Sequence, residues 1–273
     1  MEEMKRALGT ALSSLYGAAP LLTTAVVEGI DGAFVVHGLL GKQECEGIRD
    51  VVREICQNDT SYTDDSIKRR DSQHHTPCMV DEITLTLMAN RLRPYLPATA
   101  GPDNPSTLEA PGKEISTFLR CYDYMEGDFS SPHLDRSFSE HENFRLVRFS
   151  AYSIVIYLND DFEGGNTTFF VFDDPTNPLI RSNKGNTIVG GDIDRARKIS
   201  VIPSCGDALI FPHGRQPGCH LDYLHEGGMI CAGRKTILRS DIVYMAKSVK
   251  KKGKRKLRKT EGTDAKNSHT ATT

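Results

Sequence analysis

From residue 115 onward the chain is built of short apolar runs separated by turn residues, and this pattern narrows its possible folds more than any other feature. The runs lie at residues 115–124, 148–158, 166–172, 186–190, 198–204, 207–211, 228–233 and 234–246. Between them stand stretches such as "NDDFEGGN" and "PSCGD". Short apolar runs bounded by Gly, Pro, Asn and Asp predict many antiparallel strands in a sandwich or barrel.

The front part of the chain has a different pattern. Helical spacing of apolar residues predicts helices over residues 2–16, 41–56 and 81–96, with a strand at "GAFVVHGLL" between the first two. "DSIKRRDSQHHTPCMV" is expected to be a polar loop, and "PATAGPDNPSTLEAPGKE" is broken by Pro, Gly and Asn. The predicted class is therefore α+β, with an N-terminal helical support region over 1–114, a β-core over 115–246 and a tail over 247–273.

The seven cysteines are an odd number, are scattered and contain no CxxC pair. This indicates neither a disulfide framework nor a zinc site and favours a reducing compartment. No apolar run approaches the roughly 20 residues that span a bilayer. The start, "MEEMKRALGTALSSLYGAAPLL", lacks the basic and continuously apolar regions of a secretory signal. We expect a cytoplasmic or nuclear protein without membrane contact.

Charge is concentrated at the C-terminal end. From Lys247 the chain holds ten Lys and Arg against two acidic residues, a net charge of +8, and because the whole chain carries −2, residues 1–246 carry −10. The tail has almost no apolar residues to bury and is expected to be disordered. It is interpreted either as a solubilising segment or as a nuclear localisation signal or nucleic-acid contact.

The stretch "SSPHLDRSF" contains His133 and Asp135 two positions apart behind Pro132. Proline disfavours a helix interior here, and on a strand residues two apart share a face, so the imidazole and the carboxylate can converge. These are two of the three ligands of the 2-His-1-carboxylate triad that binds iron(II) and leaves coordination positions open.

The third ligand is expected among the last strands, where His213, His220 and His225 compete. Sequence spacing alone does not choose between them. Further along, Lys235 and Arg239 share one face of a predicted strand. An oxygenase with a keto-acid cosubstrate needs a buried cation for the distal carboxylate, and either side chain could serve.

Five pieces in a fixed order carry a family resemblance: "YMEGDFSSPHLD", "IYLNDDFEGGNTTF", "GDALIFPH", "LHEGG" and "GRKTILRSDIVY". Together, over about residues 115–245, they resemble the prolyl 4-hydroxylase-like branch of the iron(II)- and 2-oxoglutarate-dependent dioxygenases. The resemblance implies a double-stranded β-helix, or jelly-roll, core braced by N-terminal helices.

The resemblance also implies roles for single residues. It makes His133, Asp135 and His225 the iron ligands, although the insertion "GRQPGCHLDY" keeps His213 as a rival. Lys235 matches the residue that pairs with the 2-oxoglutarate carboxylate, with Arg239 as the alternative. Tyr124, or Tyr122 in a shifted register, matches a tyrosine that hydrogen-bonds the cosubstrate, and Thr167 falls on a strand that lines the same pocket. The long segment 171–200 is expected to shape substrate choice.

The implied activity is hydroxylation of an unactivated C–H bond with iron(II), 2-oxoglutarate and O2, release of succinate and CO2, and ascorbate as an optional reductant. The leading substrate is a prolyl side chain of a protein, followed by another side chain or a small molecule such as a free amino acid. Two alternatives stay open. One is a nucleic-acid demethylating oxygenase that holds the polymer with the basic tail, and the other is a catalytically silent metal-binding interaction module.

Overall fold

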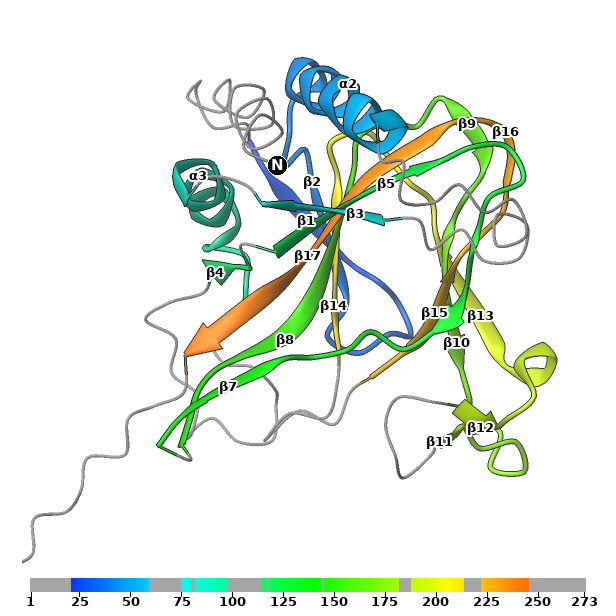
Figure 1. The fold of residues 1–273 in the computed structure, drawn as a ribbon. Coiled ribbons are helices and arrows are strands. Elements are labelled where there is room, and N and C mark those ends of the chain that lie inside the picture. The colour runs from blue at the N-terminus through cyan, green and yellow to red at the C-terminus, as the bar shows by residue number, and fades with distance from the viewer. Residues whose placement is uncertain are drawn as a thin grey trace, which may run out of the picture.

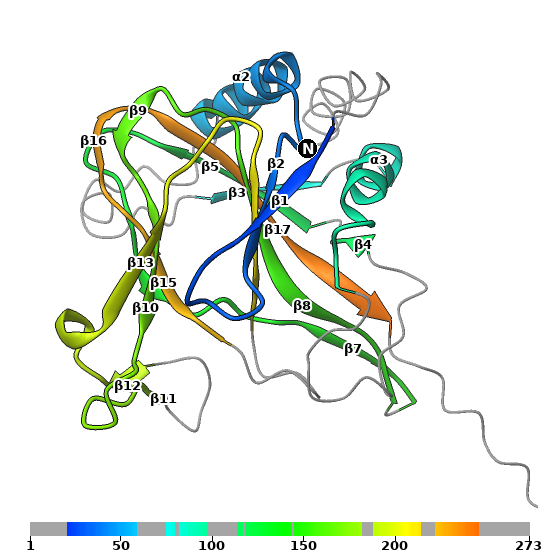
Figure 2. The ribbon, with the colours of Figure 1, turned by 180° about the vertical axis from the view of Figure 1, so that it is seen from behind.

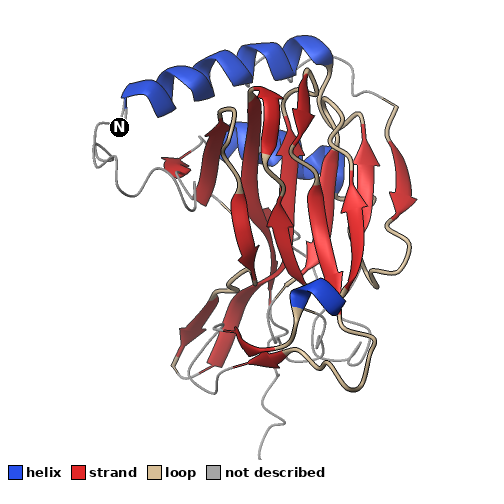
Figure 3. Cartoon of the chain, turned by 90° about the vertical axis from the view of Figure 1, so that its right-hand side faces the viewer, coloured by secondary structure: helices blue, strands red, loops and turns tan. Residues whose placement is uncertain are grey.

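The structure is a computed structural model that describes residues 21–58, 75–79, 82–97, 114–116, 118–143, 145–181, 188–213 and 222–245. It is mostly antiparallel β-sheet with few helices, and strands dominate the view in Figure 3. The helix expected over residues 2–16 and the basic tail over 247–273 lie outside the described residues.

The helical elements are α2 (Lys42–Asn58), α3 (Glu82–Leu92) and the short 3-10 helix η3 (Ile193–Arg195). The strands before the predicted β-core are β1 (Thr23–Val26), β2 (Phe34–His37) and β3 (His75–Met79). The later strands are β4 (Glu114–Ile115), β5 (Phe118–Tyr124), β6 (Ser130–His133), β7 (Ser139–Glu142), β8 (Arg145–Tyr157), β9 (Phe162–Gly164), β10 (Thr167–Val171), β11 (Ile180–Arg181), β12 (Ile188–Gly190), β13 (Arg197–Val201), β14 (Ala208–Pro212), β15 (Leu224–Gly227), β16 (Ile230–Gly233) and β17 (Lys235–Met245).

Two main sheets form the body of the molecule (Figure 1). The larger sheet has the order β1-β2-β14-β8-β17-β5-β3, with β4 added to β17 and β7 added to β8. The smaller sheet has the order β13-β10-β15-β6. Strands from distant parts of the sequence are thus neighbours, and the antiparallel β-core predicted from the apolar runs is confirmed.

The central strands of the larger sheet bury both faces. On β14, Ala208 and Ile210 belong to one core cluster, whereas Leu209 and Phe211 belong to the other. The second cluster also contains Phe169 from β10, so it fills the space between the two sheets. A strand buried on both faces needs a nearly continuous apolar run, which explains "SIVIYL" in β8 and "ALIF" in β14.

The two described α-helices lie against the outer face of the larger sheet, away from the smaller one (Figure 2). Cys45, Ile48 and Val52 of α2 are buried in the first core cluster, and Met88 and Leu92 of α3 join the same cluster. These apolar positions recur at helical spacing, which is the signal that predicted both helices.

Two sequence-based expectations are wrong in this region. The segment expected to be a polar loop contains β3, which pairs with β5 from His75 opposite Tyr122 to Met79 opposite Phe118. It is an edge strand, where a proline such as Pro77 is tolerated, so its pairing is decided by the exposed edge of β5 rather than by local pattern. The scattered cysteines did not suggest a disulfide framework, yet Cys121 is disulfide-bonded, whereas Cys45, Cys205 and Cys231 are free.

Within the described residues, no helix is both long and apolar enough to cross a membrane.

Candidate active site

His133 and His225 meet because two strands of the smaller sheet pair at these residues. His133 is the last residue of β6, His225 lies on β15, and the two are direct cross-strand partners. Their ring centroids are 4.4 Å apart. Asp135 follows the end of β6 by two residues. The three residues each offer one ligand atom, and these atoms all lie within 4.8 Å of one another.

Both imidazole rings are oriented by the backbone. His133 Nδ1 lies 2.7 Å from the Ser131 carbonyl oxygen, and His225 Nδ1 lies 3.0 Å from that of Tyr223. Because a carbonyl oxygen only accepts, each Nδ1 donates its hydrogen, and the Nε2 of a neutral ring keeps a lone pair. These Nε2 atoms lie 3.6 and 3.7 Å from the two carboxylate oxygens of Asp135. The three side chains can therefore direct their lone pairs at a single metal ion.

Electrostatics keep the site in the protonation state that a metal ion requires. Burial lowers the pKa of His225 to about 4, so its ring is neutral near neutral pH. Burial alone would raise the pKa of Asp135, but the charge of Arg239 holds that pKa well below its usual range. The site thus presents a neutral His225 imidazole and an ionised Asp135 carboxylate.

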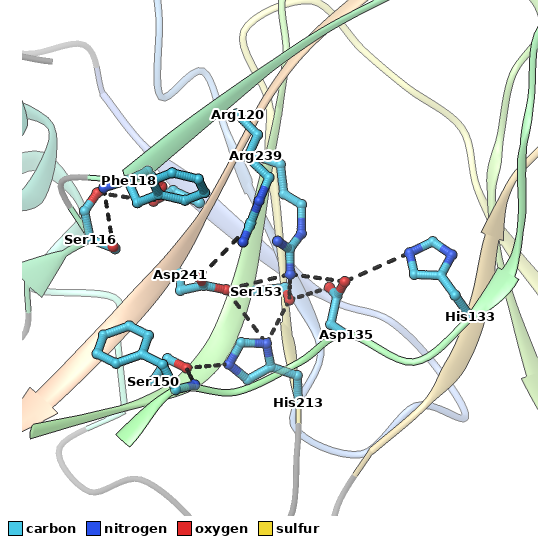
Figure 4. Close-up of polar contacts among 12 residues, drawn as sticks. Ser116, Phe118, Arg120, His133, Asp135, Ser150, Ser153, His213, Arg239 and Asp241 are labelled. Carbon is cyan, nitrogen blue, oxygen red and sulfur yellow. Dashed lines mark hydrogen bonds and ion pairs between the residues drawn. The ribbon is translucent and has the colours of Figure 1, made fainter. Parts of the chain in front are cut away.

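Asp135 is held by side chains of the larger sheet (Figure 4). Arg239 Nη2 on β17 lies 2.8 Å from Asp135 Oδ1, and Ser153 Oγ on β8 donates a hydrogen bond to Asp135 Oδ2. Oδ1 thus contacts Arg239 and faces His133, whereas Oδ2 contacts Ser153 and faces His225. Charge-assisted bonds of this kind fix the orientation of a carboxylate ligand.

The rival histidines do not join this group. His213 is buried and lies in the polar network behind Asp135, where its Nδ1 is 2.9 Å from Ser153 Oγ and its Nε2 is 3.1 Å from Ser150 Oγ (Figure 4). Both of its ring nitrogens are thus occupied by serine hydroxyls. His220 lies outside the described residues. The geometry places His225, rather than His213, with His133 and Asp135.

Lys235 is a buried cation at one end of the same cavity. Its Nζ donates a hydrogen bond of 2.5 Å to the Gly165 carbonyl oxygen, and burial lowers its pKa to about 7. The aromatic rings of Tyr124 and Tyr157 lie near it, with centroids 5.7 and 5.6 Å from Nζ. A buried lysine that has one hydrogen-bond partner among the described residues and a strongly perturbed pKa is typical of a functional site.

Gly165 makes room for this lysine. It has a φ of +67°, and a Cβ at that position would come within 2.6 Å of the Ile230 side chain and 3.2 Å of Lys235 Cδ. A larger residue would be strained by the backbone conformation and would collide with Ile230. The "EGGN" turn is therefore part of how the chain places the lysine.

The predicted cosubstrate residues lie in one cavity with the triad. The cavity has a volume of about 620 Å³. Its lining includes the predicted residues His133, Asp135, His225, Lys235, Tyr124, Arg239, Thr167 and the fallback Tyr122. Thr167 Oγ1 is 2.8 Å from the Tyr157 hydroxyl. Among the described residues that line the cavity, none comes from the long segment 171–200.

Sequence reasoning missed several residues of the site. Ser153 sits inside the apolar run "RFSAYSIVIYL", and only its polarity within a buried strand could have marked it. Arg120 lines the cavity from β5, directly opposite Arg239. Its signal was a charged residue in a run of otherwise strand-forming residues, "ISTFLRCYDY".

Comparison with known proteins supports the resemblance. No protein-family model matches the chain. The chain is 26% identical over 215 residues to a protein of Arabidopsis thaliana named probable prolyl 4-hydroxylase 3, and the alignment covers 74% of this chain and 66% of that protein. The chain thus spans just under two thirds of the relative's length. The match confirms the resemblance to the prolyl 4-hydroxylase-like family that the motifs indicated.

Two solved structures are also similar. One is the viral collagen prolyl hydroxylase of Paramecium Bursaria Chlorella virus-1 in complex with 2OG, which has 16% identity and a TM-score of 0.45 and covers 80% of this chain and 99% of that one. The other is a Pseudomonas putida prolyl-4-hydroxylase, with 13% identity and a TM-score of 0.39, covering 88% and 99%. Both TM-scores lie below 0.5, so these structures match the chain only loosely.

Proposed function

We propose that the chain is an iron(II)- and 2-oxoglutarate-dependent dioxygenase that hydroxylates an unactivated C–H bond, with a prolyl side chain of a protein as its substrate. The observation that carries this proposal is the convergence of two backbone-oriented imidazoles and one ionised carboxylate beside a buried lysine. The sequence resemblance to prolyl 4-hydroxylases supports the choice of substrate.

The donor set fits iron(II). Two imidazole nitrogens and one carboxylate oxygen on one side of an ion form the facial triad, which leaves the opposite side of the ion for other ligands. His133, Asp135 and His225 would hold the metal. Bound iron(II), together with 2-oxoglutarate and O2, supplies chemistry that places one oxygen atom on the substrate carbon and the other in succinate, with loss of CO2.

Lys235 would hold the distal carboxylate of 2-oxoglutarate. Lys235 lines the cavity together with Tyr124 and Thr167, and a carboxylate beside its ammonium group would restore the solvation that burial has removed. The Tyr124 hydroxyl is proposed as a second donor to the cosubstrate. Arg239, the alternative anchor, is engaged with Asp135 at 2.8 Å, so we assign it to orienting the metal ligand instead.

Part of the cavity wall beside the triad is apolar. Leu134, Val155 and Ile237 line the cavity beside the triad and offer no hydrogen-bonding side chain. Exclusion of water strengthens the charge interactions of the site and protects reactive species. We further propose that the two main sheets form a double-stranded β-helix and that α2 and α3 brace it.

Succinate formation tests the proposal. The purified protein is incubated with iron(II), ascorbate, 2-oxoglutarate and proline-containing peptides, and succinate and a +16 Da change of the peptide are followed by mass spectrometry. We expect His133→Ala, Asp135→Ala and His225→Ala each to abolish succinate formation. His141→Ala, an exposed histidine on β7, is the matched control and should retain it.

Three outcomes are informative. Activity that survives in His225→Ala but is lost in His213→Ala would move the third ligand to His213. Succinate formation without a change in any peptide would keep the dioxygenase and exclude a prolyl substrate. A folded, iron-loaded protein that makes no succinate with any substrate would support the catalytically silent module.

A further inference from the structure

One wall of the cavity is a ladder of three cross-strand pairs. Alternate residues of β17 and β5 point the same way, and every member of these pairs lines the cavity. The pairs are Lys235 with Tyr124, Ile237 with Tyr122, and Arg239 with Arg120. The wall therefore carries a cation at each end and an apolar and aromatic section between them.

The two cationic ends arise from separate positions along the wall. Lys235 and Arg239 are four residues apart on β17, and a strand rises about 3.3 Å per residue, which separates their Cα atoms by roughly 13 Å. A cosubstrate anchored at Lys235 reaches toward the triad and leaves the arginine end to another molecule. This step rests on the proposed function.

The arginine end carries two like charges directly opposite each other, an arrangement that is usually destabilising. The two side chains lie next to each other above Asp241 in Figure 4. Asp241 Oδ2 is 3.9 Å from Arg120 Nη1, and Asp241 Oδ1 is 3.4 Å from Arg239 Nη2. Arg239 also serves Asp135. The two arginines thus share the carboxylate of Asp241, which also contacts His213. The carboxylate of Asp135, which Arg239 contacts, also accepts a hydrogen bond from Ser153.

Arg120 and Arg239 each retain a side-chain N–H group that donates no hydrogen bond to the described residues. Arg120 Nη1 and Arg239 Nε are shielded from solvent and have no hydrogen-bond partner among the residues that the structure describes. A buried donor without a partner destabilises the folded protein, and an incoming acceptor can offset that cost. Arg120 keeps 21% of its side chain exposed, and it is one of the residues that line the cavity.

The cavity as a whole is positively charged. It is lined by four basic residues, Arg120, Arg136, Lys235 and Arg239, and by two acidic ones, Asp135 and Glu226. An iron(II) ion adds two positive charges, and a 2-oxoglutarate dianion removes them again. An excess of positive charge remains even when Asp241, behind the wall, is included.

We propose that Arg120 and Arg239 form a subsite for a carboxylate of the substrate that is oxidised, distinct from the carboxylate site at Lys235. The planar guanidinium fork matches the two oxygens of a carboxylate. The substrate is then a carbon skeleton that bears an acidic group a short distance from the C–H bond, either a free acid or a peptide with an acidic residue beside the target.

Binding of paired probes tests the subsite without requiring turnover. N-acetyl-L-proline and N-acetyl-L-prolinamide have nearly the same shape, but only the first has a carboxylate. Binding is measured by calorimetry in the Lys235→Met background, where the other carboxylate site is removed. We expect the acid to bind at least tenfold more tightly than the amide, since a charge-assisted hydrogen bond contributes about 1.5–3 kcal/mol.

Arg120→Gln should abolish this preference, and Arg195→Gln, at an exposed arginine that does not line the cavity, should leave it unchanged. If Arg120→Gln does not fold, Arg120→Lys keeps the charge, loses the fork and should weaken the preference. Acid and amide binding equally, or a preference that persists in a folded Arg120 variant, would overturn the proposal, as would a preference for inorganic phosphate over the acid.

A second probe pair separates the two sources of the carboxylate. Acetyl-Pro-Asp-amide is compared with acetyl-Pro-Asn-amide by the same measurement. Tighter binding of the aspartate peptide supports a peptide substrate, whereas a preference confined to N-acetyl-L-proline supports a free acid. These results do not depend on iron, so loss of the proposed dioxygenase activity and loss of the subsite are distinguishable.

Discussion

Replacing Lys235 with methionine should weaken cosubstrate binding and stabilise the protein at the same time. Methionine keeps much of the length of the side chain and removes only its charge and hydrogen bond. The lost charge-assisted bond is worth about 1.5–3 kcal/mol, which corresponds to a roughly 10- to 150-fold higher Kd for 2-oxoglutarate. Lys198→Met, at an exposed lysine on β13, is the matched control and should leave that Kd unchanged.

The stability effect follows from the pKa of Lys235, which burial lowers from 10.5 to about 7. That difference corresponds to a cost of at most about 5 kcal/mol for the charged form. Below pH 7 both the folded and unfolded lysine are charged, so the folded protein carries the full cost. Between pH 7 and 10.5 only the unfolded chain holds the proton, so stability rises with pH. Methionine removes this dependence.

Denaturant unfolding at pH 6 and pH 9 measures the effect, and calorimetry measures 2-oxoglutarate binding. The variant should be more stable than the wild type by a larger margin at pH 6 than at pH 9. In the wild type above pH 7, 2-oxoglutarate binding should take up a proton, detectable in buffers of different ionisation enthalpy. An unchanged Kd in Lys235→Met, with a large rise in a folded Arg239 variant, would refute the assignment of the anchor.

Three further changes have expected outcomes. Arg239→Leu should lower the unfolding free energy by about 3–5 kcal/mol at neutral pH because it leaves Asp135 buried without its main counter-charge; since folding depresses the pKa of Asp135, this loss should shrink as the pH falls below about 4. Urea unfolding of the metal-free protein measures it, and an equal loss at pH 7 and pH 3 would contradict the explanation. Leu209→Ala, which empties a fully buried position between the sheets, should cost about 2–5 kcal/mol in the same assay, and a cost under 1 kcal/mol would contradict the packing described. Deleting residues 247–273 should leave iron binding unchanged and reduce RNA binding at low salt or alter the location of a fluorescent fusion; if neither changes, the tail only solubilises.

The sequence predicted those parts of the fold that depend on local pattern. The runs that became β8 and β17 were visible because central strands bury both faces, and α2 was visible because Cys45, Ile48 and Val52 recur at helical spacing. The strand β3 was not visible, because its pairing with β5 depends on an edge exposed elsewhere in the chain.

In the candidate site too, features set by local sequence spacing could be predicted, whereas features set by long-range strand pairing could not. The pair His133 and Asp135 could be read from local spacing, whereas the choice of His225 over His213 required the pairing of β15 with β6. Spacing also placed Lys235 and Arg239 on one face but could not show that Arg239 meets Asp135. That contact joins residues more than 100 positions apart, so no local pattern contains it.

The most direct test of the proposed metal site is an anaerobic titration of iron(II) into the metal-free protein, with the bound iron counted after gel filtration. The site described here predicts about one iron per chain in the wild type and in His141→Ala, and none in His225→Ala, while circular dichroism shows that all three are folded. A wild-type protein that retains no iron, or a folded His225→Ala variant that retains as much as the wild type, would contradict the assignment of the triad.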